Sequence, residues 1–374
     1  MPKLLCTHTH THLFHHFINM TLDESNSNLS AVLYGAQDLR LEHRPMDDPK
    51  AGEVQIHVKA TGICGSDFHY YHKGRLGPRI LEKPMILGHE SCGIITRVGA
   101  DVTDFQVGDR VVIEPGHACG QCQLCLQGRY NLCSKMKFSS SLMNGVNHGT
   151  LREYVCFPWY LMPDSMTFEQ GALIEPVAVA VHAVKRTPVE AGSSVIVIGA
   201  GPVGLLVAAV ACAQGASHCL VMDIDQARLD FAQQYLPGIK TELLPVPPTT
   251  DALAWAEQQA VLLQLSADSI DVVFECTGAE TSICLAMHTV RRGGVVMLIG
   301  MGTVQCVMPI DLVLTREIDV KGNFRYAQAH HEAIALVANG RVSTKGLVTH
   351  RFALEQAAEA FEQAKHAIKV HITS

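Results

Sequence analysis

The chain has 374 residues, 48% of them hydrophobic and 17% charged, which suffices for two globular domains with separate cores. A formal charge of −7 argues against a nucleic-acid or anionic-membrane surface, and the longest apolar run, residues 203–213, is too short to span a bilayer. Thirteen cysteines without a recognisable signal peptide predict a reducing, cytoplasmic compartment, where cysteines bind metals or pack in cores rather than form disulfides.

The first 28 residues differ in composition from the rest of the chain. Two interpretations are open: a metal-binding or targeting leader, or a disordered, dispensable extension with Met20 as an alternative start. We favour the second interpretation. The stretch ends in the polar residues 23–28, and its histidines are His8, His10, His12, His15 and His16.

An incomplete set of metal ligands follows in two short segments. Cys64 lies in an ICGSD segment, and His89 and Glu90 lie in a later GHE segment. A thiolate, an imidazole and a carboxylate suit zinc, and three protein ligands leave one coordination position free for chemistry. Taken alone the pattern is weak, because most buried cysteine and histidine pairs are structural.

Four further cysteines form a compact C-x2-C-x2-C-x7-C pattern: Cys119, Cys122, Cys125 and Cys133. Four thiolates so close together predict one closed tetrahedral zinc site with a structural role, in a lobe of about residues 117–135. An iron–sulfur cluster is less favoured, because no proline follows the last cysteine. A nucleic-acid-binding zinc ribbon is rejected, because few basic residues lie nearby.

The segment from residue 195 to residue 223 has the pattern of a dinucleotide-binding unit. A β-branched run, residues 195–198, precedes a G-x-G-x-x-G turn and a helical stretch, residues 205–214. A second strand, residues 219–222, ends in Asp223, which is expected to accept hydrogen bonds from the adenosine ribose and to repel a 2′-phosphate. Asp225 adds negative charge, and Arg228, the nearest cation, is expected on the following helix. NAD is therefore predicted over NADP. The glycine turn consists of Gly199, Ala200, Gly201, Pro202, Val203 and Gly204.

Two more strands, residues 271–276 and 295–299, end near glycines, where a nicotinamide would lie beside Thr277 and Ile299. A helix is expected at residues 251–265. The cofactor domain is placed at residues 177–324. The catalytic domain is placed at residues 29–176 and 325–374, because the C-terminal tail is expected to return to it.

In the order of these motifs the chain resembles the zinc-dependent medium-chain dehydrogenases, and within them the polyol branch of sorbitol, xylitol and L-arabitol dehydrogenases. The resemblance covers about residues 30–370. It implies an α/β protein with a GroES-like β-barrel catalytic domain and a Rossmann domain, which is a doubly wound parallel sheet. The closer match lies in residues 64–77, 114–116, 171–176, 274–278, 322–326 and 347–352, with a GDRV segment at residues 108–111.

The resemblance also implies roles for individual residues. Cys64, His89 and Glu90 would hold a catalytic zinc, and Glu175 would lie beside its water, either as a ligand or through that water. Ser66 and His69 would relay the proton, although His69 can also be read as a surface histidine. Asp67 is expected to fix the ligating imidazole, with an ordinary turn aspartate as the alternative.

A polyol needs polar partners for its other hydroxyls. Tyr70 and Arg325 are the candidates, with Phe138 and Phe324 as apolar walls. Arg325 and Phe324 are also candidates for contact with the cofactor, and Tyr326 has no predicted role beyond packing. The loop of residues 138–149 looks longer and more polar than in relatives, which leaves the identity of the substrate open.

The expected function is zinc- and NAD-dependent, reversible oxidation of a secondary hydroxyl of xylitol, sorbitol or L-arabitol to the ketose, by a homotetramer. One alternative is a dehydrogenase of another secondary alcohol, an amino-acid alcohol or an aldose. Another is a non-catalytic protein on the same fold, against which the intact ligand set argues. The chain also keeps all four lobe cysteines, which some animal sorbitol dehydrogenases lack.

Overall fold

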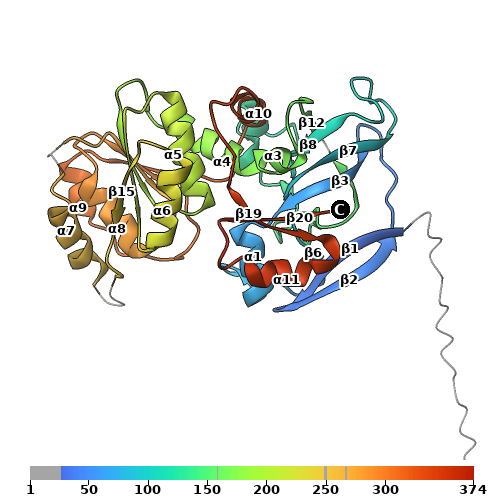
Figure 1. Ribbon diagram of the computed structural model, residues 1–374, viewed down its shortest axis with the longest axis horizontal. Coiled ribbons are helices and arrows are strands. Elements are labelled where there is room, and N and C mark those ends of the chain that lie inside the picture. Colours follow the sequence, from blue (N-terminus) through green and yellow to red (C-terminus); the bar gives the residue numbers. More distant parts are fainter. Residues whose placement is uncertain (1–26, 158, 248–250, 266–267) are drawn as a thin grey trace, which may run out of the picture.

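The computed structural model describes residues 27–157, 159–247, 251–265 and 268–374, which form two lobes joined by helix α4 (Ile174–Lys185) (Figure 1). The histidine-rich stretch falls outside these residues. The predicted leader, however, ends too late. Strand β1 (Ser27–Gly35) already includes Asn28, which is buried and whose side-chain amide exchanges two hydrogen bonds with the backbone of Tyr154. Asn28 is therefore part of the barrel, because the backbone of Tyr154 in a neighbouring strand satisfies its polar side chain.

The first lobe is a β-barrel of antiparallel pairs, joined at one edge by a parallel pair of C-terminal strands. Its main sheet runs in the order β12-β8-β7-β3-β20-β19, with β11 paired to β3. The strands are β3 (Val54–Gly62), β7 (Glu90–Val98), β8 (Arg110–Ile113), β11 (Tyr154–Phe157), β12 (Trp159–Leu161), β19 (Val348–Ala353) and β20 (Lys369–Thr373). Since β20 pairs with β3, the C-terminal tail does return to this lobe.

Smaller elements complete the first lobe. Its second sheet contains β1, β2 (Asp38–Pro45) and β6 (Met85–Ile86). Two short hairpins pair β4 (Arg75–Leu76) with β5 (Arg79–Ile80), and β9 (Gly116–His117) with β10 (Lys137–Phe138). The helices are α1 (Gly65–Lys73), α2 (Gln123–Leu126), η2 (Tyr130–Leu132), α3 (Phe168–Ala172), η3 (Leu354–Gln356) and α11 (Ala357–Gln363).

The second lobe is a six-stranded parallel sheet in the order β15-β14-β13-β16-β17-β18. The strands are β13 (Ser194–Ile198), β14 (His218–Asp223), β15 (Lys240–Leu243), β16 (Val272–Glu275), β17 (Val295–Leu298) and β18 (Asp319–Gly322). These bounds confirm the strands predicted from the β-branched runs. Strands β14 and β15 lie on one side of β13, and strands β16, β17 and β18 lie on the other side. The position between β13 and β16 is therefore the topological switch point, where such sheets bind ligands.

Helices cover both faces of this sheet, because alternate residues of each strand point to opposite sides. Val195 and Val197 of β13 face the core beneath α4, α5 (Pro202–Gln214), α6 (Gln226–Tyr235) and α10 (His330–Ala338). Ile196 and Ile198 face α7 (Ala252–Leu262), α8 (Glu280–Thr289) and α9 (Ile310–Thr315). The doubly wound arrangement predicted for this lobe is confirmed. Within the described residues, no helix combines the length and apolar character needed to cross a membrane.

Candidate active site

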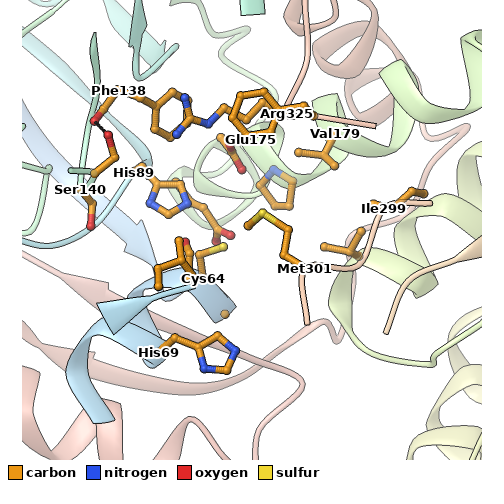
Figure 2. A pocket seen from close by; sticks show the side chains of 18 of the residues that line it. Cys64, His69, His89, Phe138, Ser140, Glu175, Val179, Ile299, Met301 and Arg325 are labelled. Atoms are coloured by element: carbon orange, nitrogen blue, oxygen red, sulfur yellow. Dashed lines mark hydrogen bonds between the residues drawn. The ribbon is translucent and has the colours of Figure 1, made fainter. Parts of the chain in front are cut away.

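A cavity of about 300 Å³ opens where the two lobes meet (Figure 2). It gathers residues from α1, β7, α4, the loop after β10, and the loops that follow β16, β17 and β18. Predicted residues that line it are Cys64, Ser66, His69, Tyr70, His89, Glu90, Phe138, Glu175, Val203, Thr277, Ile299, Phe324 and Arg325. Residues predicted from separate segments of the sequence therefore line one cavity.

The three predicted ligands are brought together by the register of two barrel strands. Gly62 of β3 pairs with Glu90 of β7, and Cys64 follows two residues later as the N-cap of α1. The ligand atoms of Cys64, His89 and Glu90 all lie within 4.8 Å of one another. Gly62 has to be glycine here, because a Cβ at this position would lie 2.2 Å from a Glu90 carboxylate oxygen. Sulfur, imidazole and carboxylate together fit zinc.

Asp67 fixes the orientation of His89. Its Oδ2 lies 3.4 Å from His89 Nδ1, which leaves Nε2 free to face a metal. The carboxylate is fully buried and accepts hydrogen bonds from the Ser140 hydroxyl at 2.5 Å and the Gly88 amide at 3.3 Å. Burial opposes its ionisation, but His89 and these donors hold its pKa below the usual value. The position agrees with the orienting role expected for Asp67, and the contribution of Ser140 was not anticipated.

Lys369, which the sequence analysis missed, is the counter-ion of Glu90. The buried Lys369 Nζ lies 2.8 and 2.7 Å from the two carboxylate oxygens of Glu90, and 3.2 Å from the Ile63 carbonyl oxygen. Burial alone would lower the pKa of Lys369, but Glu90 and Cys64 raise it overall. A lysine inside an otherwise buried strand, β20, was the available signal, since unpaired buried lysines are costly.

Glu175, in the first turn of α4, lines the same cavity. Its carboxyl is buried, and burial, reinforced by Glu90 and opposed by His89, raises its pKa to about 7. The neighbouring Tyr326 hydroxyl is also buried, and its polar neighbour is the Glu175 carboxyl. Two polar groups that face each other without a complete set of protein partners suit a bound water.

Arg325 brings a buried positive charge to the cavity. Its guanidinium carbon lies 3.5 Å from the centroid of the Phe138 ring and 4.7 Å from that of Phe324. Figure 2 shows Arg325 beside Phe138. Burial lowers the pKa of Arg325 to about 10, and its Nη1 has no hydrogen-bond partner among the described residues. The Tyr70 hydroxyl is likewise buried and has no side-chain hydrogen-bond partner among these residues; the backbone of Leu142 is its polar neighbour. Both groups are available to polar ligand atoms.

Ser66 and His69 line the cavity on the first two turns of α1. His69 is half-buried, and burial, together with the nearby Lys73 and His72, lowers its pKa. Figure 2 places its ring below Cys64, at the edge of the group of side chains. The histidine is therefore neither fully exposed, as in the surface interpretation, nor part of the ligand cluster.

The predicted substrate loop, residues 138–149, contributes Ser140, Ser141 and Met143 to the cavity. The side-chain amide of Asn147 donates to the carbonyl oxygens of Ser141 and Met143, at 3.1 and 2.7 Å, and so closes the loop on itself. Asn147 is thus used to hold the loop's own backbone, whereas Ser140 supports Asp67.

The four-cysteine lobe lies apart from the cavity and has a complete ligand set. The Sγ atoms of Cys119, Cys122, Cys125 and Cys133 lie within 4.8 Å of one another. The Sγ–Sγ distance is 3.4 Å between Cys122 and Cys125 and 3.9 Å between Cys119 and Cys125. Four sulfurs on short turns fit one tetrahedral zinc and leave no open position.

The glycine turn is shaped for close approach to a ligand. Gly199 has a φ of 106°, and a Cβ at Gly204 would lie 1.8 Å from the Gly199 carbonyl oxygen. Helix α5 begins directly after, with Gly201 as N-cap and Pro202 at its first position. Its free N-terminal amides point to the place where a pyrophosphate would bind.

The acid at the end of β14 is tied to the same turn. Asp223 Oδ2 accepts from the Ala200 amide at 2.6 Å, and Oδ1 accepts from the Asp225 amide at 3.0 Å. Arg228 lies on α6, as expected, with Nε 3.7 Å from Asp225 Oδ2. Its charge is therefore directed at an aspartate of its own helix cap.

Glycines also bring the loops after β16 and β17 together. A Cβ at Gly300 would lie 2.1 Å from the Gly278 amide nitrogen, and a Cβ at Gly278 would lie 2.3 Å from the Gly302 amide nitrogen. This contact presents Thr277, Ile299 and Met301 to the cavity, next to Val203. A flat ring between these groups would face Cys64 and His89 across the cavity.

Comparison with known proteins agrees with this architecture. Residues 50–164 match the alcohol dehydrogenase GroES-like domain, and residues 202–339 match the zinc-binding dehydrogenase domain. The chain is 41% identical to D-xylulose reductase A of Aspergillus niger over 350 residues, covering 92% of this chain and 96% of that protein. It is 40% identical to D-xylulose reductase A of Aspergillus oryzae over 343 residues, covering 90% and 94%.

Solved structures give the same result. L-idonate 5-dehydrogenase from Escherichia coli superposes with a TM-score of 0.82 at 26% identity, covering 93% of this chain and 98% of that chain. 2R,3R-butanediol dehydrogenase from Bacillus subtilis superposes with a TM-score of 0.79 at 29% identity, covering 93% and 100%. The fold and the two cysteine-containing sites define a zinc-binding dehydrogenase. The chain belongs to this family of oxidoreductases, together with the D-xylulose reductases.

Proposed function

We propose that the protein is a polyol dehydrogenase that reversibly oxidises a secondary hydroxyl of xylitol, sorbitol or L-arabitol to the ketose, with NAD as acceptor. One observation carries the proposal: the three-ligand cluster, the nicotinamide-side loops and an unpaired buried guanidinium all line one cavity. The names of the D-xylulose reductases favour xylitol as the first substrate to test.

In this proposal Cys64, His89 and Glu90 hold the catalytic zinc, and the four lobe cysteines hold a structural zinc. The bound catalytic zinc would act as a Lewis acid that lowers the pKa of the substrate hydroxyl. Asp67 keeps the His89 imidazole oriented, and the buried Lys369 ammonium pairs with the Glu90 carboxylate. Glu175 and Tyr326 hold water beside the ligands.

The substrate's other hydroxyls bind to buried polar groups that line the cavity. Within the described part of the chain, Arg325 Nη1 has no hydrogen-bond partner and the Tyr70 hydroxyl has no side-chain partner, so that a substrate hydroxyl would supply a missing hydrogen bond. Phe138 and Phe324 form the apolar walls against which the carbon chain packs. A simple alcohol lacks these hydroxyls and is expected to bind more weakly.

The substrate proton leaves by way of α1. Ser66 and His69 both line the cavity, and the lowered pKa of His69 makes a neutral imidazole available as an acceptor near neutral pH. Thr277, Ile299 and Val203 line the same cavity and would hold the nicotinamide ring, which would serve as the hydride acceptor when NAD is bound.

For the cofactor, we propose a preference for NAD. Asp223 lies at the end of β14 beside the glycine turn, and Arg228 is engaged by Asp225. Replacing Asp223 by Ala, with a lysine in place of Ile224, should raise KM for NAD about tenfold and relax discrimination against NADP. An unchanged NAD/NADP ratio of kcat/KM would contradict this assignment.

The activity is tested with a panel of xylitol, sorbitol, L-arabitol, 2,3-butanediol and 2-butanol, each with NAD and with NADP. The expected result is the highest kcat/KM for one of the polyols with NAD. A faster rate on 2,3-butanediol would favour the vicinal diol as the substrate class, in line with the structural similarity to butanediol dehydrogenase. No rate on any polyol would refute the proposal.

We also propose a homotetramer located in the cytoplasm, with no nucleic-acid partner. Every cysteine of the described residues is free, in accord with a reducing compartment. The outer strand β18, the helix α9 and the loop before that helix expose Val304, Val307, Leu314 and Val320, which suit a protein contact. Light scattering on the purified protein measures the assembly, and a monomer would exclude the tetramer.

A further inference from the structure

The four-cysteine lobe touches the segment that carries the substrate-side arginine. The turn η2 lies between Cys125 and Cys133, and it supplies two adjacent side chains to this contact. The Asn131 side-chain amide donates to the Phe324 carbonyl oxygen at 2.8 Å, and the Tyr130 hydroxyl accepts from the Gln328 amide at 2.7 Å. One hydrogen bond therefore holds the residue before Arg325, and the other holds a residue three positions after it.

The enclosed segment has an unfavourable backbone. Arg325 has a φ of 52° and Gln328 a φ of 53°, in the left-handed region that non-glycine residues seldom adopt. Such a conformation persists only where surrounding contacts hold it. Next to the segment, the Asn323 side-chain amide donates to the Arg325 carbonyl oxygen at 3.3 Å. The lobe adds the two hydrogen bonds from η2, and it also packs closely at Gly128, where a Cβ would lie 2.8 Å from Gln328 Nε2.

The residues of the four-cysteine lobe that make this contact are themselves held in place. The Tyr130 hydroxyl donates to Glu114 Oε1 at 2.8 Å, and the Tyr160 hydroxyl donates to Glu114 Oε2 at 2.7 Å. Glu114 and Asn131 are both buried, at 7% and 6% exposure. Tyr130 therefore joins a fixed carboxylate at the end of β8 to the backbone of residue 328.

We propose that the lobe is a clamp for the substrate site: Tyr130 and Asn131 are positioning residues that hold residues 324–328 so that the Arg325 guanidinium stacks on Phe138. This inference rests on the proposed role of Arg325 in binding substrate hydroxyls. It gives the lobe a part in polyol recognition in addition to stability. The cause is geometric, because the backbone conformation at residue 325 sets the direction in which its side chain enters the cavity.

The first experiment compares Asn131→Ala and Tyr130→Phe with the matched control Tyr160→Phe. Both tyrosine variants remove one hydrogen bond from Glu114, but only Tyr130→Phe also leaves the Gln328 amide unpaired. In the holoenzyme we expect KM for the best polyol to rise about five- to tenfold in the first two variants, with a smaller change in kcat. KM for NAD should stay within twofold, and Tyr160→Phe should leave the polyol KM within twofold.

The second experiment is a double-mutant cycle with Arg325→Gln. If Asn131 acts through Arg325, Asn131→Ala raises the polyol KM in the wild-type background and has no further effect in the Arg325→Gln background. KM for 2-butanol, which lacks the additional hydroxyls, should not change in either variant. Asn131→Asp provides a second variant of nearly the same size, which lacks the donor.

The outcomes separate this inference from the proposed function. If Arg325→Gln leaves the polyol KM unchanged, the assigned role of Arg325 is wrong and the clamp loses its function with it. If Arg325→Gln raises the polyol KM while the Asn131 and Tyr130 variants do not, only the clamp is refuted. Additive effects of Asn131→Ala and Arg325→Gln, or an equal rise in KM for 2-butanol, would likewise overturn it.

Discussion

The two cysteine-containing sites are built in opposite ways. The lobe takes four identical ligands from one short stretch, residues 119–133, and three of the four cysteines are partly exposed. The cavity site takes three different ligands from the end of β3 and the start of β7, with His89 and Glu90 buried. A closed site needs only a chain that can turn back on itself. An open site needs a fold that holds its ligands in place and keeps other protein groups away from the free coordination position.

The surroundings of the two sites differ accordingly. The cavity ligands are supported by groups from other parts of the sequence: Asp67 behind His89 and Lys369 behind Glu90. Both supporting groups are buried; Asp67 orients its ligand and Lys369 neutralises its ligand, while the buried Glu175 lines the same cavity. The lobe instead satisfies its sulfurs with nearby backbone amides, such as the Cys119 amide that donates to Cys133 Sγ. The open site is therefore supported by contacts between residues that are far apart in the sequence, whereas the closed site is supported by local ones.

The largest expected effect is at the open site. Cys64→Ala removes one of three ligands, and turnover of the best polyol should fall about a thousandfold or more, because the Lewis acid is lost. Folding should be retained, since the four lobe cysteines are untouched. Metal analysis should fall from about two zinc per chain to about one. Retained activity would show that the metal is held elsewhere.

At the closed site the expected effect falls on stability instead. Cys122→Ser breaks a set with no spare ligand, and we expect the melting temperature to fall by about 5–10 °C. The control is Cys306→Ser, at a partly exposed cysteine outside both clusters, which should melt within about 2 °C of the wild type. Equal melting temperatures for both variants would remove the distinction between the two sites.

A smaller effect is expected from the buried support of the open site. Asp67→Asn keeps the shape but weakens the contact to His89 Nδ1, and should lower zinc affinity or kcat about 10- to 100-fold. The melting temperature of the zinc-loaded protein should change far less than in Cys122→Ser. The measurements are zinc competition with a chelator and steady-state kinetics. An effect below twofold would mean that Ser140 and the backbone suffice to orient the site.

At neutral pH the smallest effect is expected at the seam between the four-cysteine lobe and the barrel. Burial, assisted by His331, lowers the pKa of His330 to about 3, and its ring lies against Tyr160, Tyr326 and, at 3.9 Å, Glu114. The folded state therefore binds this proton less readily than the unfolded state, whose histidine pKa is about 6.5. The stability from His330 is complete above pH 6.5 and is lost as pH falls toward 3, by about 1.4 kcal/mol per pH unit.

The variant His330→Asn should accordingly show a shallower loss of unfolding free energy between pH 6.5 and pH 4 than the wild type. Urea unfolding at several pH values measures the two slopes. Identical slopes would show that His330 becomes protonated in the folded state, and that the seam admits charge more easily than its burial indicates.

The fold class, the strands of the parallel sheet and the identity of the ligand residues could be predicted from the sequence. These features are local: β-branched runs such as residues 195–198, the glycine turn at residues 199–204 and the cysteine spacing each specify their own backbone. Tertiary structure decided which groups support the ligands. Lys369 meets Glu90 across 279 residues only because β20 and β7 both pair with β3.

The same reason explains the other unpredicted contacts. Ser140 reaches Asp67, and Asn131 reaches the backbone of residue 324 across 193 residues, through packing that no spacing along the chain encodes. The sequence by itself determined the two ligand sets and the cofactor turn. Only the closing of the barrel against the parallel sheet decided which buried charges surround the open site, because pairing register and packing, rather than local preference, bring distant side chains together.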